Sequence, residues 1–330
     1  MTCNTPEELL KLSFSFMGSR ILFTGTELNI FDILNKTPLT VQDISDKLHT
    51  DMRATTILLD ALTAMGLLVK NSDSYQCNPS LAPYLSHDDP KSMIPMILHA
   101  THLWERWSHL TDVVKGELKP GVDKGPSFSG AELKAFIGAM HAIATPQAGE
   151  IIKRINPGQS KALLDVGGAS GTYTIAFLKS SPEMKATLFD MPEVIKLARE
   201  RLGKEGLLNR VSLVGGDYLR DEIPHGHDLA FLSAVIHSNS PEQNLELYKK
   251  VFRSLIPGGR IIIRDHVMES DRTSSEAGAI FAVNMLVATE GGRTYTFEEI
   301  KAGLSKAGFN NITLFNKSDR MDAIVEGYKP

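Results

Sequence analysis

The chain has 330 residues, of which 42% are hydrophobic and 22% charged, and its formal net charge is −4. This composition is typical of a globular protein, the length allows two domains, and the acidic balance argues against a dedicated nucleic-acid or anionic-membrane binder. The two cysteines, Cys3 and Cys77, are too few for a disulfide framework or a thiolate metal site, which favours a reducing cytoplasm. We expect no signal peptide and no transmembrane span, because the sequence has no basic start and no long apolar run.

The N-terminal part of the sequence predicts helices followed by a winged helix. Thr5 to Glu8 form a helix start, and the helix after it is apolar on more than one face, which favours burial against a second subunit. Thr40 and Asp51 are expected to cap the two helices of a helix-turn-helix, the second of which covers 52–65. A strand, a turn and a strand over 67–77 complete the winged-helix pattern.

A winged helix also raises the alternative of a DNA-binding regulator. The expected recognition helix, 52–65, holds one basic residue, Arg53, and is otherwise mostly apolar. Because base and phosphate contacts need basic and amide side chains, we rank DNA binding well below an enzymatic function.

A helix predicted over 93–114 is rich in Met, His and Trp. Trp104 and Trp107 predict a wall for a flat aromatic substrate, because indole rings give broad, polarisable contacts. The histidines of this helix suggest a metal site as an alternative. However, Glu105 is the only carboxylate among His99, His102 and His109, so we expect no metal.

A second long helix is predicted over 131–155, with Ser129 as its cap, and Pro146 is expected to kink it or split it in two. We place domain boundaries at the ends of these helical regions. The expected parts are 1–100 for the winged helix, 101–157 for a helical connector and 158–330 for an α/β domain.

The main functional signal is a strand, a glycine turn and a helix over 161–179. A buried parallel strand, 162–166, contains Asp165 near its end, and Gly167, Gly168 and Gly171 follow it before a helical pattern begins. Glycine allows a sharp bend and close approach of a ligand, and a helix start offers free N–H groups. Alone, such a turn is a weak signal, because it occurs in many α/β folds.

Polar groups at the ends of the next two strands strengthen this signal. Asp190 closes the second strand about 20 residues past the last glycine, where a carboxylate can bind both ribose hydroxyls of a nucleoside. Gly216, Asp217 and Tyr218 close the third strand. An Asp beside an aromatic ring there can bind an adenine amine and cover its face.

The fourth and fifth strands are expected to deliver His237 and Asp265 to the same edge. The fourth strand is predicted over 229–236, directly before His237. A His can remove a proton from a hydroxyl near neutral pH, and a carboxylate can fix its tautomer, so the pair predicts general-base chemistry.

The rest of the second half alternates strands and helices, which predicts an α/β fold with a doubly wound parallel sheet. The last two strands, within 311–328, predict a hairpin with one antiparallel strand. An apolar helix over 277–289 carries Phe281, Asn284 and Met285, which we expect to line the substrate pocket.

Together these motifs resemble class I S-adenosylmethionine-dependent methyltransferases, and more narrowly the plant-type and bacterial small-molecule O-methyltransferases of the caffeate, flavonoid and acetylserotonin group. The family's Asp-Val-Gly-Gly-Gly-Thr-Gly is matched at 165–171, with Ala169 and Ser170 in the middle, and 189–194, which includes Met191, is close to its Phe-Asp-Leu-Pro-x-Val. The resemblance covers nearly the whole chain.

The resemblance implies S-adenosylmethionine as cofactor, a seven-stranded Rossmann-like sheet in the catalytic domain, and a winged helix used for homodimerisation. It further implies a substrate cavity bordered by the helix that carries Phe136, Met140 and His141. The family's base is the His of a Leu-His-Asp-Trp-like segment, supported by a carboxylate after the fifth strand, and His237 and Asp265 match these positions.

The sequence departs from the family at several points. Ser238 and Asn239 follow the His in place of Asp and Trp, and Ser233 stands where the family has a Lys that touches the cofactor. The family's second supporting carboxylate has no clear match, with Glu290 as the nearest candidate. These departures leave open an N-, S- or C-methyl acceptor, or a relative that binds the cofactor without transferring methyl; a nicotinamide dehydrogenase ranks lower. The His–Asp pair favours a hydroxyl, and a phenolic one, on a small apolar molecule.

Overall fold

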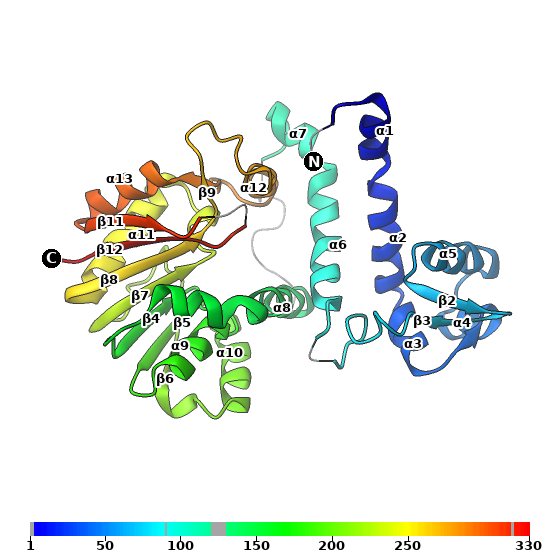
Figure 1. The fold of residues 1–330 in the computed structure, drawn as a ribbon, viewed down its shortest axis with the longest axis horizontal. Coiled ribbons are helices and arrows are strands. Elements are labelled where there is room, and N and C mark those ends of the chain that lie inside the picture. Colours follow the sequence, from blue (N-terminus) through cyan, green and yellow to red (C-terminus); the bar gives the residue numbers. More distant parts are fainter. Residues whose placement is uncertain (1–2, 90, 120–129, 318–319) are drawn as a thin grey trace. The chain divides into compact units, whose positions relative to one another are not determined.

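The computed structural model describes residues 3–89, 91–119, 130–317 and 320–330 of the chain (Figure 1). The predicted cap Ser129 lies outside these ranges. The chain forms two compact units, Met1–Glu105 and Arg106–Pro330. Within the described ranges, no helix combines the length and apolarity that a membrane crossing requires.

The N-terminal unit contains the predicted winged helix, preceded by two helices where the sequence predicted one. Its elements are α1 (Pro6–Phe14), α2 (Phe16–Glu27), α3 (Ile30–Lys36), β1 (Leu39–Thr40), α4 (Val41–Leu48), α5 (Met52–Ala64), β2 (Leu68–Asn71) and β3 (Ser74–Cys77). The three strands form an antiparallel sheet in the order β1-β3-β2. Thr40 forms the predicted capping box, Thr5 forms one at the predicted helix start, and Asp51 caps α5 by accepting a 2.8 Å hydrogen bond from the amide of Ala54.

The single helix predicted over 93–114 is wrong, because the structure has two helices there. These are α6 (Ile94–Ser108) and α7 (Leu110–Lys115). His109 separates them with backbone angles of φ −97° and ψ 7°, which are outside the α-helical range. Gly116 ends α7 in the left-handed conformation, at φ 74°.

The C-terminal unit contains a seven-stranded sheet in the order β11-β12-β8-β7-β4-β5-β6 (Figure 1). The strands are β4 (Ala162–Val166), β5 (Lys185–Asp190), β6 (Val211–Gly215), β7 (His227–Ser233), β8 (Leu255–Asp265), β11 (Asn310–Phe315) and β12 (Ala323–Tyr328). β12 runs antiparallel to both of its neighbours and the other pairs are parallel, which confirms the predicted terminal hairpin. A separate parallel pair joins β9 (Val267–Met268) to β10 (Tyr295–Thr296).

Helices pack on both faces of this sheet, as a doubly wound fold requires. They are α8 (Gly130–Ile155), α9 (Thr172–Ser180), α10 (Pro192–Lys204), α11 (Pro241–Ser254) and α13 (Phe297–Ala307), whereas α12 (Glu276–Ala288) contacts α7, β9 and the 3-10 helix that carries His237. One apolar core joins the sheet to α11 and α13 through Val251 and Leu304, and another joins its opposite face to α8 and α9 through Ile152 and Phe177. Successive side chains of each central strand therefore point alternately into one core and into the other.

The structure corrects two details of the predicted helices and strands. α8 continues through Pro146, so the expected split does not occur; buried Ala148 and Ile152 hold the second half of the helix against the sheet. β7 ends at Ser233 and does not extend to residue 236. Ala234 has φ 58°, which turns the chain out of the sheet, and His237 lies in a short 3-10 helix, Ile236–Ser238.

Candidate functional site

His237 and Asp265 lie in direct contact beyond the carboxyl ends of β7 and β8. His237 Nδ1 is 2.8 Å from Asp265 Oδ1 and 3.0 Å from Oδ2. The Asp265 side chain is 1% exposed, and Oδ1 also accepts a 2.8 Å hydrogen bond from the backbone amide of His266. These contacts fix the carboxylate and assign the Nδ1 proton to it, which leaves His237 Nε2 as the basic nitrogen of the neutral ring.

The backbone around His237 is held from two sides. The amide of Arg293 donates a 2.8 Å hydrogen bond to the His237 carbonyl, and Asn244 Nδ2 donates a 2.8 Å bond to the Ile236 carbonyl. A Cβ at Gly292 would lie 2.5 Å from the His237 carbonyl oxygen, so only glycine fits there. The loop 290–293 thus holds the main chain of His237, and Glu290, the nearest candidate for a second supporting carboxylate, is exposed.

An aromatic ring separates His237 from a second imidazole. Phe281 lies edge-on to His237 at 4.8 Å between ring centroids, and 4.9 Å from the ring of His266. Burial lowers the pKa of His266, which keeps this second ring neutral. Sequence reasoning missed His266, because nothing distinguishes it from an ordinary residue after a strand end.

Two further predicted substrate residues also come together. Trp107 Nε1 donates a 2.9 Å hydrogen bond to Asn284 Oδ1, which joins α6 to α12. Phe281 and Asn284 are half-buried, whereas Met285 is 7% exposed. Of the three α12 residues predicted to line the pocket, Asn284 therefore has its amide oxygen already bound to Trp107.

The remaining predicted substrate residues lie elsewhere. Trp104 belongs to the N-terminal unit, where its ring packs 6.2 Å from Phe16 and 6.3 Å from Phe23. Phe136 and Met140 are half-buried on α8.

His141 lies beside the glycine turn. Its Nδ1 is 2.8 Å from Thr172 Oγ1, at the first residue of α9. Burial lowers the pKa of His141 to about 4, so its ring is neutral at physiological pH. The structure therefore groups His141 with the glycine turn, and no hydrogen bond of the described residues joins it to His237.

The glycine turn after β4 takes backbone conformations that glycine permits. Gly167 and Gly171 have φ values of 69° and 79°, and Ala169 reaches 49° without being glycine. A Cβ at Gly168 would lie 2.7 Å from Leu188 Cγ, so that residue has no room for a side chain. The turn is thereby held as a tight cradle directly before α9.

Asp165 and Asp190 brace this turn from two strands. Asp190 Oδ2 accepts a 2.8 Å bond from the Ala169 amide and its Oδ1 a 2.7 Å bond from the Met191 amide. Asp165 Oδ2 accepts a 2.5 Å bond from Thr174 Oγ1, and burial raises the pKa of Asp165 to about 7. Each Asp190 oxygen keeps acceptor capacity for a further donor, whereas Asp165 is 2% exposed and faces the protein interior.

The third strand end forms a second cradle. A Cβ at Gly216 would lie 2.6 Å from the Phe189 ring, so a side chain is excluded there. Asp217 Oδ1 accepts a 2.9 Å bond from the Leu219 amide, and Tyr218 Oη donates a 3.3 Å bond to Asn239 Oδ1.

These features fit a nucleoside-bearing cofactor. Gly168 and Gly216 pack directly on Leu188 and Phe189, so no side chain of their own covers the backbone there, and the Asp190 carboxylate on the strand β5 has spare acceptor capacity. Such a site suits ribose hydroxyls and an adenine ring better than it suits a metal ion. Among the described residues, no group of three His, Cys, Asp or Glu side chains is placed to hold a metal.

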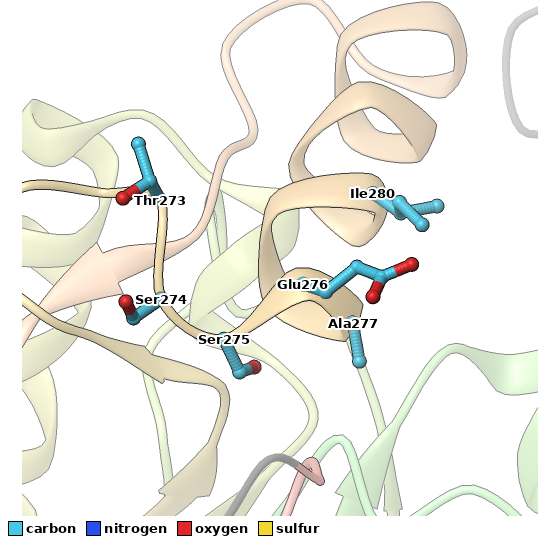
Figure 2. A pocket seen from close by; sticks show the side chains of 6 residues that line it. All are labelled: Thr273, Ser274, Ser275, Glu276, Ala277 and Ile280. Carbon is cyan, nitrogen blue, oxygen red and sulfur yellow. The ribbon is translucent and has the colours of Figure 1, made fainter. Parts of the chain in front are cut away.

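Figure 2 shows a surface pocket at the start of α12, outside this constellation. Its volume is about 550 Å³, and its lining residues are Thr273, Ser274, Ser275, Glu276, Ala277 and Ile280. None of the predicted site residues lines it. All of its lining residues come from the single segment 273–280, so the pocket does not alter the assignment of the site.

Family profiles match two parts of the chain. Residues 127–310 match the family profile of the O-methyltransferase domain, and residues 10–83 match that of the O-methyltransferase dimerisation domain. The tetracenomycin polyketide synthesis 8-O-methyl transferase TcmO of Streptomyces glaucescens is 28% identical over 98% of this chain and 97% of its own length. Acetylserotonin O-methyltransferase of Gallus gallus is 26% identical over 97% of this chain and 96% of its own length.

Solved structures share the fold over nearly the whole chain. PigF with SAH has a TM-score of 0.89 and 24% identity, covering 99% of this chain and 100% of that chain. Human N-acetylserotonin methyltransferase in complex with SAM has a TM-score of 0.85 and 23% identity, covering 99% of each chain. The chain therefore belongs to the O-methyltransferase family and is an S-adenosylmethionine-dependent O-methyltransferase.

Proposed function

We propose that the enzyme methylates a phenolic hydroxyl of a small, mostly apolar molecule, with His237 as general base and Asp265 as its supporting carboxylate. The observation that carries the proposal is the 2.8 Å contact between His237 Nδ1 and Asp265 Oδ1. A buried carboxylate in this position orients the ring, presents Nε2 to an incoming hydroxyl and stabilises the imidazolium that forms.

The base is needed because of the acceptor's acidity. S-adenosylmethionine supplies an electrophilic methyl group on a positively charged sulfur when it is bound. A phenol has a pKa of about 10 and is largely un-ionised at neutral pH. His237 Nε2 therefore removes the phenolic proton as the oxygen attacks, and Asp265 holds the ring in place during the transfer.

The cofactor is assigned to the two glycine cradles. In this scheme Gly167, Gly168 and Gly171 allow the backbone to approach it, and Met191 and Ser233 complete its surroundings, while the buried Asp165 supports the cofactor site by bracing the turn from the interior. Asp190 binds the ribose hydroxyls, because its oxygens can accept beyond their two backbone bonds. Gly216, Asp217 and Tyr218 are assigned to the adenine ring.

The acceptor is assigned to the side of His237 that faces α12. Phe281 provides an apolar wall in contact with the base, and Asn284 and Trp107 provide a fixed polar pair. α8, which carries Phe136 and Met140, contributes a further wall in this scheme. Relatives named for 8-O-methyl transfer in tetracenomycin synthesis and for 3-O-methylation of 3-hydroxy-5-methyl-1-naphthoate support a ring hydroxyl as the acceptor.

We further propose a homodimer formed through the N-terminal unit. The dimerisation-domain match covers 10–83, and apolar side chains on α1 and α2 are open to solvent in the single chain, including Leu9 at 61% and Phe14 at 56%. Exposed apolar surface of this kind is characteristic of subunit interfaces.

A product assay tests the proposed function. The protein is incubated with S-adenosylmethionine and matched panels of phenols, anilines and thiophenols, and S-adenosylhomocysteine release and methylated products are measured by mass spectrometry. Turnover on phenols that exceeds turnover on the other panels by at least tenfold is expected. Preference for an amine or a thiol would contradict the hydroxyl assignment.

A further inference from the structure

Arg264 is a buried cation without an acidic partner. Its side chain is on β8 and is 5% exposed, and its Nε has no hydrogen-bond partner. Within the described ranges, no ion pair joins Arg264 to a carboxylate. The nearby carboxylates are bound elsewhere: Asp265 contacts His237, and Asp322 pairs with Arg154 at 3.9 Å. A buried guanidinium with an unpaired donor destabilises the folded protein unless an anion accepts its free N–H groups.

A second buried donor without a partner lies beside Arg264. The Tyr173 hydroxyl has no hydrogen-bond partner, and its side chain is 9% exposed. The guanidinium carbon of Arg264 lies 5.2 Å from the centre of the Tyr173 ring, and Arg264 Nη1 donates a 3.1 Å bond to Ser233 Oγ. Arg264, Tyr173 and Ser233 therefore form one cluster, which we call the arginine cluster.

The arginine cluster is placed at the level of the glycine turn. In the sheet, Ser233 of β7 lies opposite Arg264 of β8. The preceding residue of β7, Leu232, lies opposite Val166 of β4, and Gly167 follows Val166 directly. Tyr173 is the second residue of α9, the helix that the turn begins. Ser233 and Gly167 are only half-buried, so the cluster reaches the open edge of the sheet through them.

We propose that the arginine cluster binds the carboxylate of the methionyl end of S-adenosylmethionine. The inference rests on the proposed position of the cofactor over the glycine turn. That cofactor carries one anionic group, its carboxylate, and a guanidinium with spare N–H groups is the side chain best suited to bind it. The hydroxyls of Tyr173 and Ser233 supply further donors, and the first turn of α9 adds its free amides.

The test compares two ligands that differ only in this carboxylate. S-adenosylhomocysteine and its decarboxylated analogue, S-adenosyl-3-thiopropylamine, are titrated into the full-length protein by calorimetry without any acceptor. The wild-type protein is expected to prefer the carboxylated ligand. In Arg264→Met, binding of S-adenosylhomocysteine should weaken about 10- to 100-fold and binding of the analogue by less than about threefold, so the preference collapses.

Matched variants separate this role from a structural one. Arg260→Met makes the same change on the same strand, where Arg260 pairs with Glu326 at 2.5 Å, and should leave both affinities within about twofold. Arg264→Lys keeps the charge and should recover part of the preference. Should Arg264→Met fail to fold, Ser233→Ala, which removes a single hydroxyl, should narrow the preference by roughly three- to tenfold.

Three outcomes would overturn the inference. Equal weakening of both ligands would show a purely structural role for Arg264, and unchanged affinity for both would remove it from the cofactor site. Unchanged S-adenosylhomocysteine binding together with a raised KM for carboxylated acceptors would assign the cluster to the acceptor instead. Failure of the wild-type protein to bind S-adenosylhomocysteine would overturn the cofactor assignment and this inference together, whereas loss of the His237 role would leave the inference intact.

Discussion

Trp107 Nε1 donates a 2.9 Å hydrogen bond to Asn284 Oδ1 across 177 positions of the sequence. Because an indole N–H can only donate, the bond fixes the orientation of the Asn284 amide, with its oxygen toward Trp107. The NH₂ group of Asn284 is therefore the donor that remains for a bound molecule. In the proposed acceptor pocket, this NH₂ group favours an acceptor with a hydrogen-bond-accepting oxygen near the hydroxyl that receives the methyl group.

Asn284→Asp tests this assignment, because it keeps an oxygen for Trp107 and removes the NH₂ donor. We expect the KM for a phenolic acceptor to rise by about tenfold, with S-adenosylhomocysteine affinity within about twofold of the wild type. Steady-state kinetics and calorimetry provide the two readings. Trp107→Phe serves as the matched control, since it keeps the NH₂ donor of Asn284 but removes the bond that fixes the orientation of the amide. An unchanged KM in Asn284→Asp would show that Asn284 does not bind the acceptor.

The exposed apolar side chains of α1 predict the oligomeric state. Leu9→Glu combined with Phe14→Glu introduces charges on surface that is 61% and 56% exposed in the single chain and buried in the proposed dimer. Light scattering after size-exclusion chromatography should show a dimer for the wild type and a monomer for this variant. Ile57→Glu, on a side chain of α5 that is 55% exposed, is the control; a wild-type monomer would refute the homodimer.

The two cysteines should differ sharply in reactivity. Cys3 is exposed, whereas Cys77 is buried at the end of β3, and burial raises the pKa of Cys77 to about 11. Since the thiolate is the reactive form, a thiol reagent at pH 8 should label one cysteine in the native protein and two after denaturation. Cys3→Ser should abolish native labelling, and rapid modification of Cys77 in that variant would contradict the packing of the winged helix.

Asp165 predicts a specific pH dependence of stability. Burial raises its pKa from 3.8 to about 7 in the folded protein, so ionisation favours the unfolded state as pH rises between these values. The penalty is absent below about pH 4, grows up to about pH 7 and is constant above it, with a size of about 4 kcal/mol at most. Asp165→Asn removes the charge, so its stability relative to the wild type should increase over that range.

Chemical denaturation of the cofactor-free protein at several pH values measures this difference. Asp73→Asn, at an exposed position in the turn between β2 and β3, is the control and should show no trend. The stability difference between Asp165→Asn and the wild type could instead stay constant from pH 4 to 7. That result would mean that the pKa of Asp165 is not raised in the folded protein.

Local sequence signals were sufficient for most of the fold. The caps Thr5, Thr40 and Asp51 mark their helices because side-chain acceptors at helix starts depend only on neighbouring residues. The strand boundaries of β4, β5 and β6 followed from short apolar runs that end at glycine or aspartate. The break at His109 had no such signal, because no glycine or proline marks it. At Pro146 the packing of α8 against the sheet prevented the expected split.

The sequence predicted only those contacts of the site that follow from the order and the ends of the strands. His237 and Asp265 were paired in advance because adjacent strands end at one edge. Arg264 was not singled out, since its lack of an acidic partner depends on contacts from α9 and β7 that no local pattern encodes. The place of His141 beside Thr172 likewise depends on how α8 packs on α9.

The role of His237 is tested most directly by the kcat of His237→Asn on a phenolic acceptor. The amide keeps a polar side chain of similar size beside Asp265 but cannot accept a proton at neutral pH. We predict a fall in kcat of about 100-fold or more, with S-adenosylhomocysteine affinity within about twofold of the wild type. A kcat within about threefold of the wild type would show that the acceptor loses its proton without this imidazole.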